Sequence, residues 1–149
     1  MTKLEVLIMA YDALVERNIS VPRSKVFAQL YDFGGIKKIL PEAIGSCECV
    51  GEGIGAVRTI ALADGSGTVV ERMEAAHDDT TFAYSITAND ALPVENYVAV
   101  VTLSDTSDGG TNVQWGSNWH ATGGAPEDEV QGALEGLYNA IIDGMEAAG

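Results

Sequence analysis

Two charged residues on adjacent predicted strands have the types and spacing to form a polar site inside the protein. Asp64-Gly65, between the two strands, is typical of a two-residue type I′ turn, which would pair Arg58 with Glu71 on one face of the hairpin. Alternate residues of a strand share a face, and the neighbours on this face are apolar: Ile60 and Leu62 beside Arg58, Val69 and Met73 beside Glu71. We therefore expect both charged side chains to point inward.

An inward pair of Arg58 and Glu71 has two interpretations. Buried charges are normally paired, so one interpretation is a charge pair that satisfies itself inside the sheet. The other is a polar anchor for a hydroxyl, carbonyl or carboxylate group of a ligand.

A second set of residues with inward parity is mostly large and apolar. Aromatic side chains belong to the core by default because they bury the most area. They would equally line a cavity for an apolar ligand. The set comprises Tyr84, Ile86, Tyr97, Ala99, Val101, Val113, Trp115, Ser117 and Trp119.

The remaining reactive residue types predict no metal site. Cys47 and Cys49 lie two apart on a predicted strand, where a disulfide would need the strand to distort, and free thiols fit a reducing compartment. A metal would need more ligands than these two, and the only histidines, His77 and His120, lie far off in the sequence. His120 has the opposite parity to Trp119 and is expected to point outward, and His77 lies in a predicted turn.

These residues are expected on an antiparallel sheet that is followed by one long helix. Strands separated by turn residues, with helices in separate places, predict an α+β fold. The predicted strands are 13–21, 44–50, 56–63, 67–76, 81–87, 95–103 and 111–121, with short helices at 24–31 and 36–40. Val26, Phe27, Leu30 and Tyr31 are the expected inner face of the first short helix. Residues 1–12 fit both helical and alternating patterns and are predicted to form an extra helical or extended arm.

The last helix is predicted from about 126 to 148. Pro126 suits the first helical position, and three acidic residues follow it. One broad apolar face recurs at spacings of three and four: Val130, Leu134, Leu137, Tyr138, Ile141, Ile142 and Met145. Gly132, Gly136, Ala140 and Gly144 form a row of small residues. This row indicates either close approach of another element or room beside a cavity.

Length and charge limit the class of protein. A chain of 149 residues predicts one domain over 1–149. The net charge of −14, from 22 acidic and 8 basic residues, repels phosphate backbones, so nucleic acid is not an expected partner. No stretch has the roughly 18 apolar residues that a membrane span requires. We therefore expect a soluble, cytoplasmic protein.

A series of short motifs follows the chain in order. They are Val21-Pro22, Lys25-Val26-Phe27, Asp32-Phe33-Gly34, Gly53-Ile54-Gly55-Ala56-Val57-Arg58-Thr59, Asp64-Gly65, Val70-Glu71-Arg72-Met73, Tyr84-Ser85-Ile86, Leu92-Pro93-Val94, Tyr97 and Val113-Gln114-Trp115. From about Ala13 onward this series resembles the polyketide cyclase/START-like superfamily, also called SRPBCC or Bet v 1-like. The resemblance implies a helix-grip fold. In that fold a curved seven-stranded antiparallel sheet grips a long C-terminal helix, two short helices follow the first strand, and a cavity lies between sheet and helix.

Some of these motifs resemble one branch, the bacterial relatives of the plant abscisic acid receptors. They are Glu71-Arg72-Met73, Asp78-Asp79, Ser85-Ile86 and Asn96-Tyr97. Those receptors carry a lysine that grips the hormone carboxylate two residues before a Ser-Cys pair, and here Gly45 precedes Ser46-Cys47. The proline-bearing gate loop is replaced by residues 63–67. Hormone perception is therefore not expected.

The resemblance and the apolar inward faces together predict binding of a lipid-like or polycyclic small molecule in an internal cavity. No cofactor or metal is expected, and a homodimer is a possible assembly. The expected ligand-binding residues are Arg58, Ile60, Leu62, Glu71, Met73, Tyr84, Ile86, Tyr97, Ala99, Trp115, Ser117, Val130, Leu134 and Tyr138.

Two alternatives remain open. The first is an enzyme of the cyclase/dehydratase kind, with Glu71 as general acid or base and Tyr97 or Arg58 stabilising an enolate. A carboxylate held by Arg58 would stay ionised, which argues against this role. The second is a protein-binding domain that uses the same groove.

Overall fold

The computed structural model describes residues 2–149, apart from the side chains of residues 4 and 7–9. The elements follow in this order: α1 Lys3–Ala10, β1 Ala13–Ile19, α2 Arg23–Tyr31, the 3-10 turn η1 Phe33–Gly35, α3 Ile36–Ile39, β2 Ile44–Val50, β3 Val57–Leu62, β4 Thr68–His77, β5 Thr81–Asn89, β6 Val94–Asp105, β7 Thr111–Ala121 and α4 Glu127–Ala148. The seven strands form one antiparallel sheet in the order β1-β7-β6-β5-β4-β3-β2.

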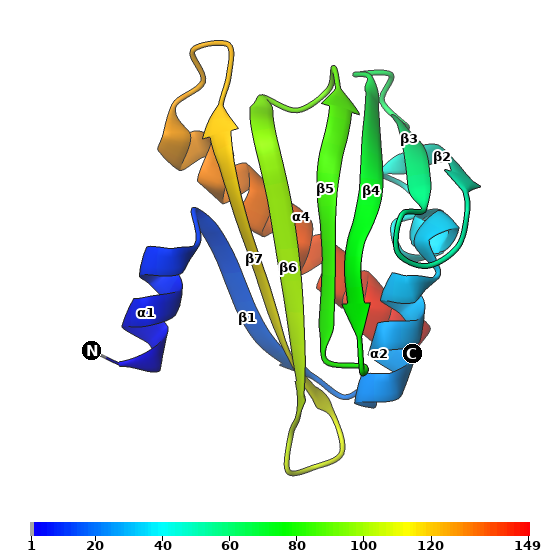
Figure 1. Cartoon of the computed structure of the whole chain (residues 1–149), viewed down its shortest axis with the longest axis vertical. Helices are drawn as coiled ribbons and strands as arrows, with labels where there is room; N and C mark the ends of the chain where they lie inside the picture. Colours follow the sequence, from blue (N-terminus) through cyan, green and yellow to red (C-terminus); the bar gives the residue numbers. More distant parts are fainter. Residues whose placement is uncertain (1) are drawn as a thin grey trace.

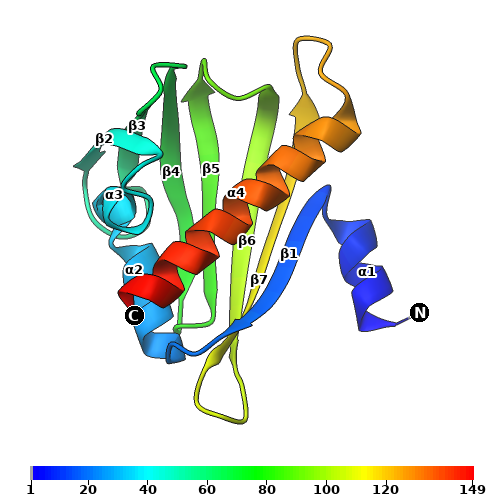
Figure 2. The ribbon, with the colours of Figure 1, turned by 180° about the vertical axis from the view of Figure 1, so that it is seen from behind.

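The long helix α4 runs diagonally across one face of this sheet, and the short helices α2 and α3 lie beside its C-terminal half (Figures 1 and 2). The first strand returns to pair with the last one, so β1 and β2 form the two edges of an open sheet. This arrangement confirms the predicted α+β helix-grip fold and the two short helices after the first strand.

The structure refines the predictions for both ends of the chain. The arm at 1–12 contains the helix α1. The pattern of Leu4, Leu7 and Ile8 that suggested it lies outside the described side chains. At the other end Pro126 is not the first helical residue, because its ψ of 135° is extended. Its carbonyl accepts a hydrogen bond from the Val130 amide, so Pro126 is the N-cap and α4 begins one residue later.

The β3–β4 hairpin has the predicted register and a different turn. Arg58 pairs with Glu71, as expected. The Gly65 amide donates to the Leu62 carbonyl at 3.2 Å, and Gly65 has a φ of 77° whereas Asp64 has no positive φ. A type I′ turn needs positive φ at both central residues, so the predicted turn type is wrong although the pairing that it implied is right.

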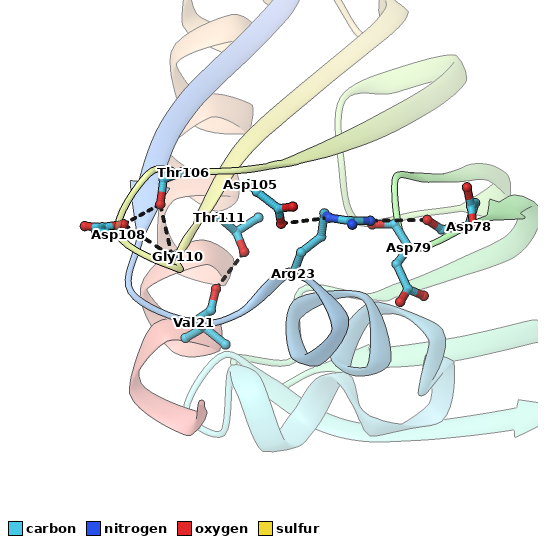
Figure 3. A network of polar contacts seen from close by, with 9 residues as sticks. All are labelled: Val21, Arg23, Asp78, Asp79, Asp105, Thr106, Asp108, Gly110 and Thr111. Carbon is cyan, nitrogen blue, oxygen red and sulfur yellow. Dashed lines mark hydrogen bonds and ion pairs between the residues drawn. The ribbon is translucent and has the colours of Figure 1, made fainter.

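Positive φ at two consecutive residues occurs instead in the β4–β5 turn, at Asp78 (54°) and Asp79 (53°). Arg23, the first residue of α2, donates from Nη1 to the carbonyls of these two residues at 3.3 and 3.1 Å (Figure 3). Its Nε donates to Asp105 Oδ1 at 2.9 Å, and this hydrogen bond raises the pKa of Arg23. Arg23 therefore fastens α2 to the ends of three strands.

The core lies between the inner face of the sheet and α4. The inward set predicted on β5, β6 and β7 is buried except for Ile86, which is half-buried. In α2 the structure buries Val26 and Leu30, but Tyr31 is 37% exposed, so its predicted inward position is wrong. Its ring stacks on Phe27, with ring centroids 6.0 Å apart, and its hydroxyl lies beside Gly53 in the loop between β2 and β3.

The row of small residues on α4 has a structural reason at one position. A Cβ atom on Gly144 would collide with the carbonyl of Ile39, so close approach of α3 requires glycine there. Gly132 and Gly136 face open space. Neither close packing nor a cavity explains these two glycines.

No helix in the described residues is long and apolar enough to cross a membrane. Residues 2–149, as described, also hold no cluster of three histidine, cysteine or acidic residues placed to bind a metal ion. Cys47 and Cys49 are free thiols, and burial raises the pKa of Cys47. His77 and His120 are both exposed.

Candidate ligand-binding cavity

A cavity of about 260 Å³ lies between the sheet and α4. Its wall comes from strands β2 to β6, from α4 and the α3 region, and from the loop between β5 and β6. Nearly all of the wall is aliphatic, because strand alternation and the apolar face of α4 direct these side chains into the same space. The polar groups among the lining residues are those of Arg58, Glu71, Tyr84 and Tyr97.

Most of the predicted site residues line this cavity: Arg58, Ile60, Leu62, Glu71, Tyr84, Ile86, Tyr97, Val130 and Leu134. The others, Met73, Ala99, Trp115, Ser117 and Tyr138, do not line it and are packed in the core. They lie on the correct face, but the ring of Tyr138 stacks on Trp115 with centroids 5.4 Å apart and fills the space there. Trp115 instead borders a separate, small void of about 10 Å³, which Arg58 also lines.

Several lining residues were not predicted. Ile36 and Leu40 come from the α3 region, and Ile44 from the start of β2. Leu92 and Pro93 come from the loop before β6, and Val94 is the first residue of β6. Leu137 and Ile141 could have been included, because they belong to the predicted apolar face of α4. The loop residues have no periodicity that would indicate a lining role.

The Arg58–Glu71 pair forms the charged end of the cavity. Arg58 Nε and Nη2 both approach Glu71 Oε1, at 2.8 and 2.7 Å. Arg58 Nη1 donates to the Phe33 carbonyl at 3.2 Å, and the guanidinium carbon lies 3.9 Å from the centre of the Phe33 ring, a cation–π contact. Both members of the pair are only 7% exposed, so the predicted inward orientation is confirmed.

The second carboxylate oxygen of Glu71 is differently placed. Within the described part of the chain, Oε2 accepts no hydrogen bond, although Glu71 lines the cavity. Oε2 is not among the buried side-chain atoms that lack a partner, so it keeps accessible surface on a residue that lines the cavity. It is therefore free to accept a hydrogen bond there.

Next to this carboxylate, five side chains form one buried chain of hydrogen bonds. Trp115 Nε1 donates to Tyr84 Oη at 3.3 Å, and Tyr84 Oη lies 3.1 Å from Tyr97 Oη. Tyr97 Oη contacts Tyr138 Oη, which donates to Ser117 Oγ at 2.6 Å. Because Tyr138 gives its one hydroxyl hydrogen to Ser117, Tyr97 donates to Tyr138 and Tyr84 donates to Tyr97. The chain holds the Tyr84 and Tyr97 hydroxyls at the cavity wall.

Burial changes the acidity of these phenols. It raises the pKa of Tyr84 and of Tyr97 well above the usual value, and that of Tyr138 to about 12. All three are therefore neutral near pH 7. They can donate or share hydrogen bonds, but they do not supply a phenolate base.

The raised pKa values predict that the protein loses stability in alkali. An unfolded tyrosine has a pKa of about 10, so the stabilisation is complete below that pH and is lost as the pH rises through the folded values. Urea unfolding from about pH 8 to 12 should show this decline. Tyr138→Phe should make the decline shallower, whereas Tyr31→Phe, at an exposed site, should follow the wild type. Equal slopes in all three proteins would contradict the assignment.

The comparisons with known proteins agree with this geometry. The profile of the family described as polyketide cyclase / dehydrase and lipid transport matches residues 13–148. No curated protein matches the chain in sequence.

Solved structures share the fold at low sequence identity. An uncharacterised protein from Bacillus thuringiensis has a TM-score of 0.76 at 23% identity, covering 91% of this chain and 96% of that chain. The protein XoxI from Bacillus cereus has a TM-score of 0.75 at 22% identity, with coverage of 91% and 94%. A protein from Nitrosospira multiformis has a TM-score of 0.69 at 20% identity, with coverage of 91% and 93%. At these identities the likeness shows the fold alone.

The family profile spans the whole chain from β1 to α4, the same elements that build the sheet, the helix and the cavity between them. This protein belongs to the polyketide cyclase / dehydrase and lipid transport family, within the Bet v 1-like superfamily.

Proposed function

We propose that this protein binds a small hydrophobic molecule, lipid-like or ring-containing, in the cavity between the sheet and α4. The observation that carries the proposal is an aliphatic cavity with one free carboxylate oxygen, Glu71 Oε2, at its charged end. An apolar wall with a few convergent polar groups is typical of small-molecule sites. The family description, which includes lipid transport, supports the same class of ligand.

The polar end suggests which functional group the ligand carries. A carboxylate oxygen accepts hydrogen bonds, so it favours a hydroxyl or another donor. The volume of about 260 Å³ lies near the lower end of typical ligand pockets, roughly 300–1,000 Å³. We therefore propose a ligand with one or two rings, or one short acyl chain, that ends in a hydroxyl group.

A thermal-shift comparison of 1-naphthol with 1-methoxynaphthalene tests this proposal. The two molecules share a ring system, but only naphthol donates a hydrogen bond. We expect naphthol to raise the melting temperature more than methoxynaphthalene does, because the ligand that binds more tightly stabilises the folded state more. A ligand at about 100 times its Kd stabilises the folded state by ~2.7 kcal/mol. The variant Glu71→Gln should reduce the difference between the two ligands.

The control variant is Ala133→Phe. Ala133 lines the cavity and is itself exposed, so a larger ring there should block the mouth without disturbing the core. Binding should weaken at least tenfold while the melting temperature of the free protein stays unchanged. Equal stabilisation of the blocked variant and the wild type would place the ligand outside this cavity.

The unpaired Glu71 Oε2 also supports the second candidate function, an enzyme of the cyclase/dehydratase type. An unpaired carboxylate oxygen beside two neutral phenols could move a proton on a bound polyketide-like substrate. Turnover of a bound ligand that is lost in Glu71→Gln would favour the cyclase/dehydratase type of enzyme. Stabilisation by the ligand without turnover favours binding alone.

The proposal also includes the location, the domain extent and the assembly of the protein. We place the protein in the cytoplasm as one domain over 1–149, a location supported by its two free thiols. The homodimer stays a prediction that sedimentation analysis would test. A relationship to the bacterial relatives of the abscisic acid receptors would concern ancestry and not the ligand, because Gly45 stands where those receptors have a lysine.

A further inference from the structure

We propose that β2 and the loop after it form an interface with a second copy of this chain. β2 is the last strand of the sheet and pairs on one side only, with β3 (Figure 1). We call residues 46–56, together with Tyr31, the β2 face. Among the described residues, no member of the β2 face lines the apolar cavity, so the interface is independent of the proposed ligand.

The two edges of the sheet differ in how they are covered. At the β1 edge, α4 supplies acceptors: the Leu14 amide donates to Glu135 Oε2 and the Ser20 amide donates to Glu146 Oε2, both at 3.0 Å. At the β2 edge, only Cys47 of residues 46–50 is half-buried, and the others are exposed. An exposed edge strand is a template for pairing with another chain. β2 can therefore pair with its own copy in antiparallel fashion about a twofold axis.

Apolar side chains continue the same surface. Within the described residues, five large apolar side chains are exposed, and three of them belong to the β2 face. Val50 is 78% exposed at the end of β2, and Ile54 is 62% exposed in the loop that follows. Tyr31 joins them because its hydroxyl lies beside Gly53 of this loop. Exposed apolar side chains that gather in one place indicate a contact surface for a protein.

The distribution of charge selects a second copy as the partner. Residues 23–55, which contain α2, α3, β2 and most of the loop, hold four basic and four acidic residues, so their formal charges cancel. The basic residues are Arg23, Lys25, Lys37 and Lys38, and the acidic residues are Asp32, Glu42, Glu48 and Glu52. The net charge of −14 therefore belongs to the rest of the chain, where two copies repel each other.

This neutral segment is continuous in space with the β2 face. Helix α3 packs against β2, and Lys37 Nζ donates to the Gly45 carbonyl at 2.7 Å. A basic partner would be attracted to the acidic remainder of the molecule instead. Two copies of the chain can approach each other without net repulsion only through the neutral segment, which also carries the exposed strand edge and the apolar cluster.

Sedimentation equilibrium of the full chain tests the interface. The measured mass should rise from the monomer toward twice that value as the protein concentration increases from about 1 to 100 μM. Sodium chloride at about 0.5 M should strengthen the association, because screening weakens the repulsion between the acidic surfaces.

A pair of variants shows whether the dimer uses the β2 face. Ile54→Asp adds a charge at an exposed position, so it should leave the melting temperature unchanged and raise the dimer dissociation constant about tenfold or more. Val98→Asp is the matched control. Val98 is 45% exposed on β6, outside the β2 face, and the same added charge there should leave the dissociation constant unchanged.

Hydrogen exchange locates the contact without any variant. Amides of residues 46–50 should exchange more slowly in concentrated than in dilute protein, since pairing with the second copy protects them. Amides of β1 should exchange at the same rate at both concentrations, because α4 already covers that edge.

Four results would overturn the proposal. The first is a monomer mass at every concentration. The second is a dimer that Ile54→Asp and Val98→Asp weaken equally, and the third is concentration-dependent protection of β1 in place of β2. The fourth is association that weakens with added salt, because such a contact would be ionic and would lie outside the neutral segment.

Discussion

Replacing Arg58 with methionine or Glu71 with leucine is expected to lower the free energy of unfolding by about 3–5 kcal/mol in each single variant. Each change leaves the remaining charge buried without its partner, since both residues are 7% exposed and the pair shares one oxygen, Glu71 Oε1. The Phe33 carbonyl and ring partly compensate Arg58. We therefore expect Arg58→Met to lower the free energy of unfolding by more than the loss of the ion pair alone would, because the substitution also removes the two contacts with Phe33.

The double variant should cost much less than the sum of the two singles. With both charges absent, the hairpin holds two apolar side chains among aliphatic neighbours, a change that is often nearly neutral. Urea unfolding of the four proteins gives the coupling energy directly.

A second arginine–glutamate pair, which lies on β4 as Glu71 does, serves as the matched control. Arg72 and Glu74 form an ion pair at 2.8 Å, but their side chains are 46% and 34% exposed. Exposed pairs contribute about 0–1 kcal/mol, so the same cycle there should show weak coupling. Stability losses that are equally small at both pairs would mean that water reaches Arg58 and Glu71. A loss of ligand affinity in that case would make the pair an anchor for the ligand.

The register that places this pair could be predicted because it has two independent determinants. The Asp64-Gly65 sequence marked the hairpin, and the apolar neighbours of Arg58 and Glu71 marked the inward face. A shift by one residue would have turned Arg58 and Glu71, each with its apolar neighbours, to opposite faces of the hairpin. The type of turn was predicted wrongly without affecting the pairing, because the loop of Ala63–Ser66 keeps the same residues opposite each other.

The limits of the cavity could not be predicted in the same way. Strand alternation assigns a side chain to a face but does not show how far along the strand the cavity extends. Met73 and Ala99 have the correct parity and are fully buried, since the core is filled at their level. The bulge at Asn96 changes the parity of β6, and nothing in the sequence pattern indicates it. The contact of Tyr97 with Tyr138 joins residues 41 apart and depends on how α4 crosses the sheet.

The second large effect is expected for a substitution in α4, the helix that crosses the sheet and covers the core. Ile142→Asp should unfold the protein. Ile142 is fully buried against the sheet. Loss of its side chain alone costs about 2–5 kcal/mol, and an unpaired buried carboxylate adds several more. The sum is comparable with the whole stability of a typical domain, roughly 5–15 kcal/mol. Circular dichroism and urea unfolding measure the result.

Ala140→Asp tests whether this effect comes from burial or from the helix itself. Ala140 lies two residues away on the exposed side of α4, so the same carboxylate there remains in water. Its cost is the lower helix propensity of aspartate, about 0.7 kcal/mol, and the melting temperature should fall only slightly. If Ile142→Asp melts like Ala140→Asp, α4 does not close the core. The cavity that depends on α4 would then need a different wall.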